Sequence, residues 1–497
     1  MLKINRRQFI TFAVAGGGIV TASHFWLKQS KSEVNLSKQS SNPTQVYRSQ
    51  NGLLEVDLEA NYTEIDLGGR TAYLLTYNGQ IPAPRLEAKV GDRIRIHFSN
   101  KLQQPTNLHY HGLHISPTGK ADNVFLKINP RESFNYEFEI TTNQPAGTFW
   151  YHPHLHSYAA DQLSGGLAGL FVIRGELDEI PEIKAAKEEF LVLQDFALDD
   201  RGQLLSSDYL PIMAGREGNL ITANGEINPT LTLAENGLLR LRILNASTSR
   251  FYNLAFENHP FYLIATDGGA IAQPIKMTQL LLTPGQRAEI LLKGEEEPKT
   301  YPLLNLPYNR GGMGMMGGGM MGRRGGMMGR GIGDNNRNSN ATNRLATLQY
   351  DSTVEPIPLP TQLTSISQLP EPDRKRTFTL NHGMAPGMGM VFLFNGQTYN
   401  HQRIDTQVKL NTVEEWELVN TGVMDHPFHV HVNSFQVISR NGQNEPYLAW
   451  RDTVLVRQGE TVKIRILFQD FTGKTVYHCH ILDHEDLGMM GNLEIIR

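Results

Sequence analysis

Apolar and polar residues alternate in three segments that are spaced along the chain. The segments are residues 91–100 (GDRIRIHFSN), 236–245 (NGLLRLRILN) and 412–420 (TVEEWELVN), and each ends at an asparagine. A period of two is typical of a half-buried β-strand, because successive side chains of a strand point to opposite faces of the sheet. The terminal asparagines, Asn100, Asn245 and Asn420, are 145 and 175 residues apart. This spacing predicts three copies of one β-domain.

A second similar segment follows each of these three, at residues 130–140, 284–292 and 458–466. Turns rich in Gly and Pro are frequent, and long segments with a helical period are few. A chain of this kind favours β-sandwiches. We therefore predict an all-β protein of three Greek-key β-sandwich domains, with a proline-rich linker at 354–372; the domains are residues 46–176, 190–352 and 375–497.

Residues 1–28 have a different character from the rest of the chain. A start that carries Lys3, Arg6 and Arg7 precedes an apolar run at 11–22, which predicts a signal peptide. The pair Arg6-Arg7 followed by Phe9-Ile10 resembles the twin-arginine signal, which bacteria use to export folded proteins. We expect the twin-arginine export machinery as a partner and a periplasmic or otherwise extracytoplasmic location. A leader that is not cleaved would instead anchor the protein to the membrane.

Charge and cysteine content exclude several classes of function. The chain has 46 Lys and Arg against 50 Asp and Glu, a net charge of -4, which predicts no nucleic-acid partner and no basic membrane-binding face. Its single cysteine excludes an intramolecular disulfide and any zinc or iron–sulfur site built from several cysteines. Against that one cysteine stand 17 His and 16 Met, which are abundant metal-binding side chains.

Histidines recur in pairs at one position of the repeat. The residues nine and eleven places after the terminal asparagine are His109 and His111 in the first copy and His429 and His431 in the third. The middle copy has Leu254 and Phe256 at these positions. Residues i and i+2 of a strand point the same way, so each pair can present two imidazoles to one point.

A second set of pairs shows the same asymmetry between the copies. His152 and His154 align with His478 and His480, whereas the middle copy has the stretch 300–305 without histidine. Four pairs at matched positions predict that eight imidazoles converge where the first and third domains face each other. Imidazole clusters without carboxylates suit copper, zinc or iron.

The lone cysteine distinguishes among these metals. Cys479 is followed by His484 and Met489, and His426 stands where the other copies have Thr106 and Phe251. One thiolate, two imidazoles and a weak thioether ligand are the ligands of a blue-copper centre. Cys479 and its neighbours His478 and His480 point to opposite faces of the strand, so the thiolate can serve a mononuclear site while the neighbours reach the imidazole cluster.

Together these motifs resemble the multicopper oxidases over nearly the whole mature chain. The matching motifs are His109-Tyr-His111-Gly, His152-Pro-His154, His426-Pro-Phe-His429-Val-His431 and His478-Cys479-His480 through Met489. The resemblance implies three cupredoxin-like domains and four copper ions per chain. It assigns type 1 copper to His426, Cys479, His484 and Met489, type 2 copper to His109 and His429, and the binuclear type 3 pair to His111, His152, His154, His431, His478 and His480.

The resemblance also implies a reaction. A small reductant would give single electrons to type 1 copper, and four electrons would reduce O2 to two waters at the trinuclear cluster. Asp122 and Glu485 are similar to the acidic groups that supply protons in the family. The partners expected are O2 and a reducing substrate, and the chain is expected to be a monomer.

The reductant is suggested by methionine. The glycine-rich insertion at 311–330 carries seven methionines, and Met384, Met388 and Met390 follow in another short stretch. Thioethers select Cu(I), and Met424 and Asp425 directly precede His426. This pattern resembles the periplasmic cuprous oxidases that give copper tolerance. The candidate ligands of substrate Cu(I) are Met424, Asp425, Met313, Met315, Met316, Met320 and Met321.

Other functions remain open at this point. A laccase-type oxidase would act on phenols or aromatic amines and use the methionine segment as a lid. A non-enzymatic copper-binding or scaffold protein is the alternative from another class. A copper nitrite reductase fits less well, because the second histidine beside Cys479 and the three-copy length do not suit it. The remaining histidines are interpreted as structural or surface residues, namely His24, His97, His114, His156, His259, His382 and His401.

Overall fold

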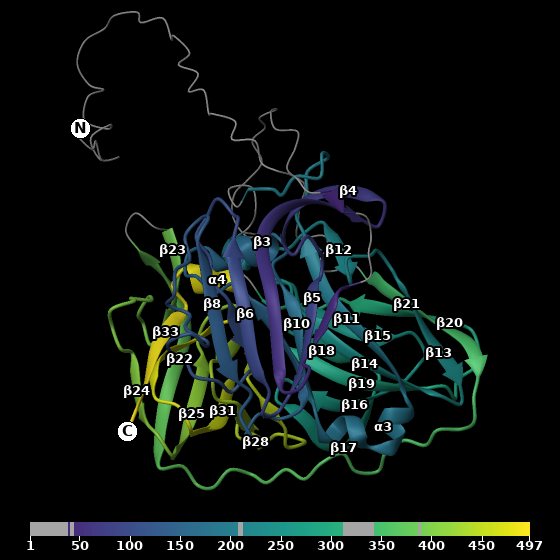
Figure 1. The fold of residues 1–497 in the computed structure, drawn as a ribbon. Coiled ribbons are helices and arrows are strands. Elements are labelled where there is room, and N and C mark those ends of the chain that lie inside the picture. The colour runs from purple at the N-terminus through teal and green to yellow at the C-terminus, as the bar shows by residue number, and fades with distance from the viewer. Residues whose placement is uncertain (1–37, 40–43, 207–211, 312–341, 386–388) are drawn as a thin grey trace, which may run out of the picture. The chain divides into compact units, whose positions relative to one another are not determined.

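The computed structural model describes residues 38–39, 44–206, 212–311, 342–385 and 389–497. The leader at 1–28 lies outside these residues, and so does all of the glycine- and methionine-rich insertion after Gly311. The described part of the chain holds no helix with the length and apolar character needed to cross a membrane. Six sheets follow one another in three pairs along the chain (Figure 1).

The first pair of sheets lies between residues 38 and 174. One sheet orders its strands β1 (Lys38–Gln39), β3 (Leu53–Leu67), β6 (Arg93–Asn100) and β8 (Ser133–Glu139), with β4 (Arg70–Tyr77) also paired to β3. The other orders its strands β2 (Val46–Arg48), β5 (Ala83–Lys89), β10 (Gly169–Arg174), β9 (Gly147–His152) and β7 (His109–His111). The core between them buries side chains such as Leu58, Phe98 and Tyr151.

The middle pair of sheets lies between residues 187 and 353. One sheet orders its strands β12 (Leu220–Ala223), β11 (Lys187–Phe196), β14 (Leu238–Asn245), β19 (Arg287–Lys293), β16 (Phe261–Thr266) and β17 (Gly269–Met277). The other orders its strands β13 (Thr230–Glu235), β21 (Asn343–Thr353), β20 (Thr300–Leu306), β15 (Tyr252–Phe256) and β18 (Leu280–Leu282). The insertion therefore connects β20 to β21, which pair antiparallel.

The third pair lies between residues 374 and 496. One sheet orders its strands β23 (Gly389–Phe394), β22 (Arg374–Ala385), β25 (Thr412–Asn420), β31 (Thr461–Phe468), β27 (Phe435–Arg440) and β28 (Gln443–Asn444), with β29 (Trp450–Arg451) on β27. The other orders its strands β24 (Thr406–Lys409), β33 (Met490–Ile496), β32 (Gly473–Cys479), β26 (His426–Val430) and β30 (Thr453–Val456). The described helices are short: α1 (Ala159–Ser164), α2 (Glu176–Glu179), α3 (Pro181–Ala185), η3 (Ile212–Ala214) and α4 (Leu482–Asp486).

The sequence repeat has one structural meaning in all three sandwiches. The first repeated segments form β6, β14 and β25, and the second form β8, β19 and β31, which pair antiparallel with the first. Asn100, Asn245 and Asn420 end the first strand in each copy. Each side-chain carbonyl accepts the backbone N–H two residues on, and each side-chain amide donates to the carbonyl two residues before the second segment. These buried hydrogen bonds explain why asparagine stands at this place in every copy. The all-β prediction of three cupredoxin-like sandwiches is confirmed.

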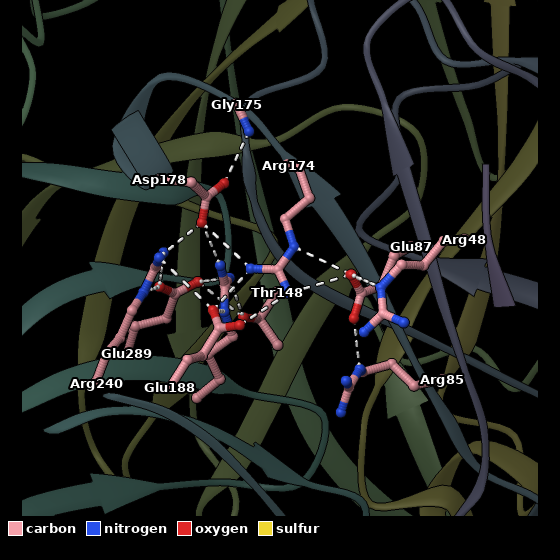
Figure 2. Close-up of polar contacts among 11 residues, drawn as sticks. Arg48, Arg85, Glu87, Thr148, Arg174, Gly175, Asp178, Glu188, Arg240 and Glu289 are labelled. Carbon is pink, nitrogen blue, oxygen red and sulfur yellow. Dashed lines mark hydrogen bonds and ion pairs between the residues drawn. The ribbon is translucent and has the colours of Figure 1, made fainter. Parts of the chain in front are cut away.

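A network of charged side chains joins the first and middle sandwiches. Figure 2 shows Arg174 on β10 between the carboxylates of Glu87 and Glu188, at 3.2 and 2.8 Å. Arg240 lies against Glu289 at 2.6 Å, and Glu289 also accepts the hydroxyl of Thr148 on β9 at 2.8 Å. Buried ions are costly unless each is paired and hydrogen-bonded, so this network fixes the position of the two sandwiches relative to each other.

Candidate metal centre

The histidine pairs occupy matched strand pairs in the first and third sandwiches. On β7 and β9, His109 lies opposite His152 in the antiparallel register. On β26 and β32, His429 lies opposite His478. The corresponding pair in the middle sandwich, β15 and β20, has Leu254 opposite Asn305. The middle copy is therefore folded like the others but offers no imidazole at this place.

Eight imidazoles from the first and third sandwiches come together in three groups of three, two of which share His111. His154 and His431 each place Nε2 3.0–3.1 Å from Nε2 of His478. The other groups are His111 with His152 and His480, and His109 with His111 and His429, and within each group the ligand atoms lie within 4.8 Å of one another. All eight side chains are buried. The sequence predicted the convergence but not this division into groups.

The chemistry of these donor atoms fits a metal. Among the described residues no hydrogen-bond partner reaches Nε2 of His109, His152, His429 and His480 or Nδ1 of His111. Unpartnered polar atoms are rare in a protein interior, and here they are aimed at one another. Burial lowers the pKa of the imidazoles of His109, His111, His152, His154, His431, His478 and His480. Neutral imidazoles with free lone pairs are the form that binds a metal ion.

A separate group surrounds the lone cysteine in the third sandwich. Sγ of Cys479 lies 3.5 Å from Nδ1 of His426 and 3.8 Å from Nδ1 of His484, and these two nitrogens are 3.3 Å apart. Burial raises the pKa of the Cys479 thiol and lowers the pKa of His426 to about 3. A soft thiolate beside two neutral imidazoles suits copper.

Met489 and Phe392 enclose this second group. Met489 is buried; its N–H donates to the His484 carbonyl at 2.8 Å, and its carbonyl accepts the N–H of Cys479 at 3.0 Å. The ring of Phe392 on β23 stacks on His484 with a centroid distance of 3.7 Å. The imidazoles of His426 and His484 are both buried, and Phe392 of the β22–β23 hairpin covers His484.

Comparison with known proteins agrees with this arrangement. Models of the multicopper oxidase family match residues 59–178, 195–316 and 368–496. The chain is 30% identical over 456 residues to "Multicopper oxidase mco" of Staphylococcus haemolyticus, which covers 88% of both chains. The chain belongs to the multicopper oxidase family. Members bind copper and use O2 and a reducing substrate, so this chain is an oxidoreductase by family.

Two further relatives bear on the function of this multicopper oxidase. A solved structure, "Multicopper oxidase from Campylobacter jejuni: a metallo-oxidase", is 32% identical with a TM-score of 0.77 and covers 94% of this chain and 98% of that one. "Cell division protein FtsP" of Glaesserella parasuis is 27% identical over 479 residues and covers 94% of this chain and 93% of the relative.

Both predicted acidic residues lie beside the imidazole cluster of this oxidase. Asp122 accepts hydrogen bonds from Nδ1 of His109 at 2.9 Å and from the Tyr110 N–H at 3.0 Å. Burial raises the pKa of Asp122 to about 8, against a lowering by the Tyr110 N–H. Glu485 on α4 lies 3.1 Å from Nδ1 of His478 and 3.8 Å from Nδ1 of His154, and burial raises its pKa.

Two residues at the cluster were missed by sequence reasoning. Asp452, between β29 and β30, accepts Nε2 of His111 at 2.9 Å, and its main-chain carbonyl accepts Nδ1 of His429 at 2.8 Å. Burial raises the pKa of Asp452, but Arg287 of the middle sandwich and His429 together outweigh burial and hold the pKa below its ordinary value. The position of Arg287 in the repeat was a usable signal, because the other copies have Ser133 and Thr461 there.

The candidate Cu(I) ligands are only partly within the described residues. Met313, Met315, Met316, Met320 and Met321 lie outside them. Met424 and Asp425 are buried next to His426. The Asp425 carboxylate accepts the Tyr308 hydroxyl at 2.7 Å and the Gln458 N–H at 2.8 Å, so in this structure it is already engaged by protein groups.

His382 lies closer to the cysteine group than sequence reasoning indicated. It stands on β22 opposite Phe392, and a Cβ added to Gly422 would lie 3.5 Å from its Nδ1 and 3.7 Å from Nε2 of His426. Four of the other histidines set aside have side-chain contacts: His97 with Glu55, His114 with Asp470, His156 with Asp486 and His259 with Tyr350. His24 lies outside the described residues.

Asp122 should make the stability of the copper-free protein depend on pH. Its folded pKa of about 8 exceeds its unfolded value of 3.8, so the folded state holds a proton that the unfolded state has lost between these values. Stability therefore falls as pH rises through that window. Asp122→Asn removes the titrating group and with it the fall in stability that Asp122 causes. We therefore expect the unfolding temperature of the variant, relative to that of wild type, to rise between about pH 5 and about pH 9. Calorimetry of both copper-free proteins measures the two unfolding temperatures. A difference between them that does not change with pH would contradict the raised pKa of Asp122.

Proposed function

We propose that the protein is a four-copper oxidase that couples four one-electron oxidations of a reductant to the reduction of O2 to two waters. One observation carries this proposal. Cys479 lies with His426 and His484 in one group, while its chain neighbours His478 and His480 lie in two different triads of the imidazole cluster. The three-residue segment 478–480 thus joins the cysteine group to two triads of the imidazole cluster. Electron transfer between the two sites needs such a short covalent connection.

The proposed copper assignments combine the groups of donor atoms with the ligand motifs of the family, which add Met489 and give His111 to type 3 copper although it also lies with His109 and His429. Type 1 copper takes His426, Cys479, His484 and Met489, and type 2 copper takes His109 and His429. One type 3 ion takes His111, His152 and His480, and the other takes His154, His431 and His478. Copper bound at these residues would supply reversible one-electron transfer and the reduction of dioxygen.

The chain's own residues provide the path between the sites. Cys479 is joined to His478 and His480 by single peptide bonds, and β32 is held against β26 with Phe428 opposite Cys479 and His429 opposite His478. The His480 N–H donates to the Pro427 carbonyl at 2.7 Å, which fixes the residue after the cysteine to the strand that carries His426. These bonds hold the imidazoles of His478 and His480 on the side of the extended chain opposite to the Cys479 side chain.

Asp122 and Glu485 are the proposed proton carriers. Each carboxyl group is buried, and burial raises the pKa of each. Asp122, with a pKa of about 8, can hold a proton near neutral pH, and Glu485 holds its proton to a higher pH than an ordinary glutamate does. Asp122 would deliver a proton from its carboxyl oxygen at the His109 side. Glu485 would do so at the side of His154 and His478. Asp122 thus lies at His109 and His431, and Glu485 lies at the two other members of the triad that contains His431.

Cys479→Ser tests the four-copper proposal. We expect the variant to lose the intense blue absorption and to bind one copper fewer per chain, with O2 uptake below about one hundredth of wild type for every reductant. The imidazole cluster should still take up copper, because its eight ligands are unchanged. Copper analysis, absorption spectra and an oxygen electrode give the three readouts. Full oxidase activity in this variant would refute the proposal.

Cu(I) is the reductant that the surroundings of the type 1 group favour. Gly311, the first residue of the methionine-rich insertion and the one residue of it that the structure describes, pairs with Met424, and the Arg310 carbonyl accepts the Asp425 N–H at 2.9 Å. The insertion therefore begins beside His426. On the β22–β23 hairpin, Met384 lies opposite Met390 and is 77% exposed. Thioethers prefer Cu(I), and the Campylobacter jejuni relative is described as a metallo-oxidase.

Two other functions are kept as alternatives. A laccase-type oxidase would use the same copper residues with phenols or aromatic amines. A non-enzymatic role in the cell envelope is the second, because one relative is a cell division protein. The complete set of buried donor atoms favours an enzyme over a scaffold, since a scaffold gains nothing from unpartnered buried imidazoles.

Replacing the seven methionines of 311–330 with leucine tests the choice of reductant. Leucine keeps the apolar volume but removes the thioether, so we expect the KM for Cu(I) to rise about tenfold while the KM for a phenol stays unchanged. Met277→Leu on β17, in the sheet of the middle sandwich that contains β19, is the matched control and should leave both values unchanged. Equal KM values for Cu(I) in all three proteins would favour the laccase alternative.

We propose that the protein is exported to the periplasm by the twin-arginine route and is a monomer there. Arg6 and Arg7 precede the apolar run at 11–22, and export after folding would let copper be bound before or after transport. We expect replacement of both arginines with lysine to retain the protein in the cytoplasm, as measured by fractionation of the producing bacterium. Normal export of that variant would contradict this route. Size-exclusion chromatography with light scattering measures the oligomeric state.

A further inference from the structure

One side chain of the middle sandwich reaches the imidazole cluster although that sandwich supplies no imidazole. Arg287, the first residue of β19, is buried and uses its guanidinium N–H groups on all three sandwiches. Nε donates to the Thr148 carbonyl at 3.0 Å. The two Nη atoms donate to the carbonyls of Gly285 and Asp267 at 3.1 and 2.9 Å and to the carboxylate of Asp452 at 2.9 and 2.6 Å.

Asp452 in turn determines the protonation pattern of two imidazoles. Its carboxylate accepts Nε2–H of His111, and its main-chain carbonyl accepts Nδ1–H of His429. Carboxylate and carbonyl oxygens only accept hydrogen bonds here, so the proton of each ring is held on the nitrogen that faces Asp452. The lone pairs are then on Nδ1 of His111 and Nε2 of His429, which have no hydrogen-bond partner among the described residues. Such outer partners orient metal-binding imidazoles.

The pair of Arg287 and Asp452 is closely packed. Two parallel hydrogen bonds from a guanidinium fix the plane of a carboxylate, which one lysine ammonium could not do. A Cβ added to Gly112, in the His-Tyr-His-Gly motif, would lie 2.5 Å from Nη2 of Arg287 and 2.6 Å from Oδ2 of Asp452. A glycine at this place therefore makes room for the pair. Gly285 lies close to the imidazole cluster as well, because a Cβ added to it would lie 2.8 Å from the ring of His480.

The same strand holds the first sandwich at a second point. Glu289, two residues after Arg287 on β19, accepts the hydroxyl of Thr148 at 2.8 Å (Figure 2). Thr148 therefore bonds β19 through its side chain and through its carbonyl. It lies on β9, the strand that carries Trp150 and His152, and the Trp150 ring stacks on His152 with a centroid distance of 4.1 Å. The middle sandwich thus contacts strands or loops from both histidine-bearing sandwiches.

We propose that Arg287 is a positioning residue of the trinuclear centre. It holds Asp452 so that His111 and His429 keep their unprotonated nitrogens directed at the type 3 and type 2 positions. This inference rests on the proposed function, since it takes both imidazoles as copper ligands.

Arg287→Gln in the copper-loaded protein tests the inference. We expect the blue absorption of type 1 copper to remain, while the type 2 electron paramagnetic resonance spectrum changes and the type 2 copper is lost more readily to a chelator. We expect kcat to fall about 10- to 100-fold with the KM for the reductant unchanged, because the reductant meets only the type 1 site. Arg287→Lys keeps the charge without the paired hydrogen bonds and should give an intermediate result.

Arg240→Gln is the matched control. Arg240 is buried on β14, next to β19, and pairs with Glu289 and Asp178 but touches neither Asp452 nor a histidine of the cluster. We expect it to lower the unfolding temperature about as much as Arg287→Gln and to leave the type 2 spectrum and kcat as in wild type. The comparison distinguishes the effect of losing a buried ion pair from the effect of losing the position of Asp452, His111 and His429.

The outcomes that would overturn the inference are distinct from those that would overturn the oxidase proposal. An Arg287→Gln protein with the type 2 spectrum and kcat of Arg240→Gln would show that Arg287 is only structural. If Arg287→Gln does not fold, Asp452→Asn replaces it, with the same spectral change expected and a wild-type spectrum as the contrary result. A wild-type protein that takes up copper but shows neither a type 2 signal nor O2 uptake would instead refute the proposed function.

Discussion

The structure depends on keeping eight imidazoles buried between two sandwiches with their lone pairs free. Burial disfavours the protonated form and lowers the pKa of seven of these rings, His109 among them, and acceptors such as the carboxylate of Asp122 and the Pro153 carbonyl hold a proton on one nitrogen. The remaining nitrogens cost about 1–3 kcal/mol each when they are buried without a partner. Without a metal, the buried nitrogens therefore lower the free energy of unfolding. The surrounding sheets must supply the stability that offsets this cost.

Three copies of one sandwich serve three different purposes in this chain. The first and third keep histidine at the positions after the terminal asparagine, whereas the middle copy has Leu254 and Phe256 there and packs them in its own core. That copy nevertheless contributes through β19, whose Arg287 bonds main-chain or side-chain atoms of all three sandwiches. Repetition of the fold thus gives rigid strands for the centre, and divergence of a few side chains gives each copy its role.

The two ends of the proposed electron path are built differently. The imidazole cluster stands on paired strands whose register fixes each donor, as with His109 opposite His152. The approach to the type 1 group is formed instead by Gly311 at the start of the insertion and by the β22–β23 hairpin with Met384 and Met390. Strands hold a geometry that chemistry requires, while connecting segments can vary with the reductant at little cost to the fold.

The sequence by itself determined the strands, the repeat and the set of donor side chains. Period-two alternation and the offsets from Asn100, Asn245 and Asn420 are local properties of the chain, and so is the order His478-Cys479-His480. Only the tertiary structure decided that His111 shares a group with His152 and His480, that His382 lies near His426, and that Asp452 and Arg287 support the cluster. His382 and His426 stand on the two sheets of one sandwich, whereas the other contacts form where separate sandwiches dock. The repeat predicted that the first and third sandwiches face each other, but the spacing of residues along the chain does not specify which side chains meet there.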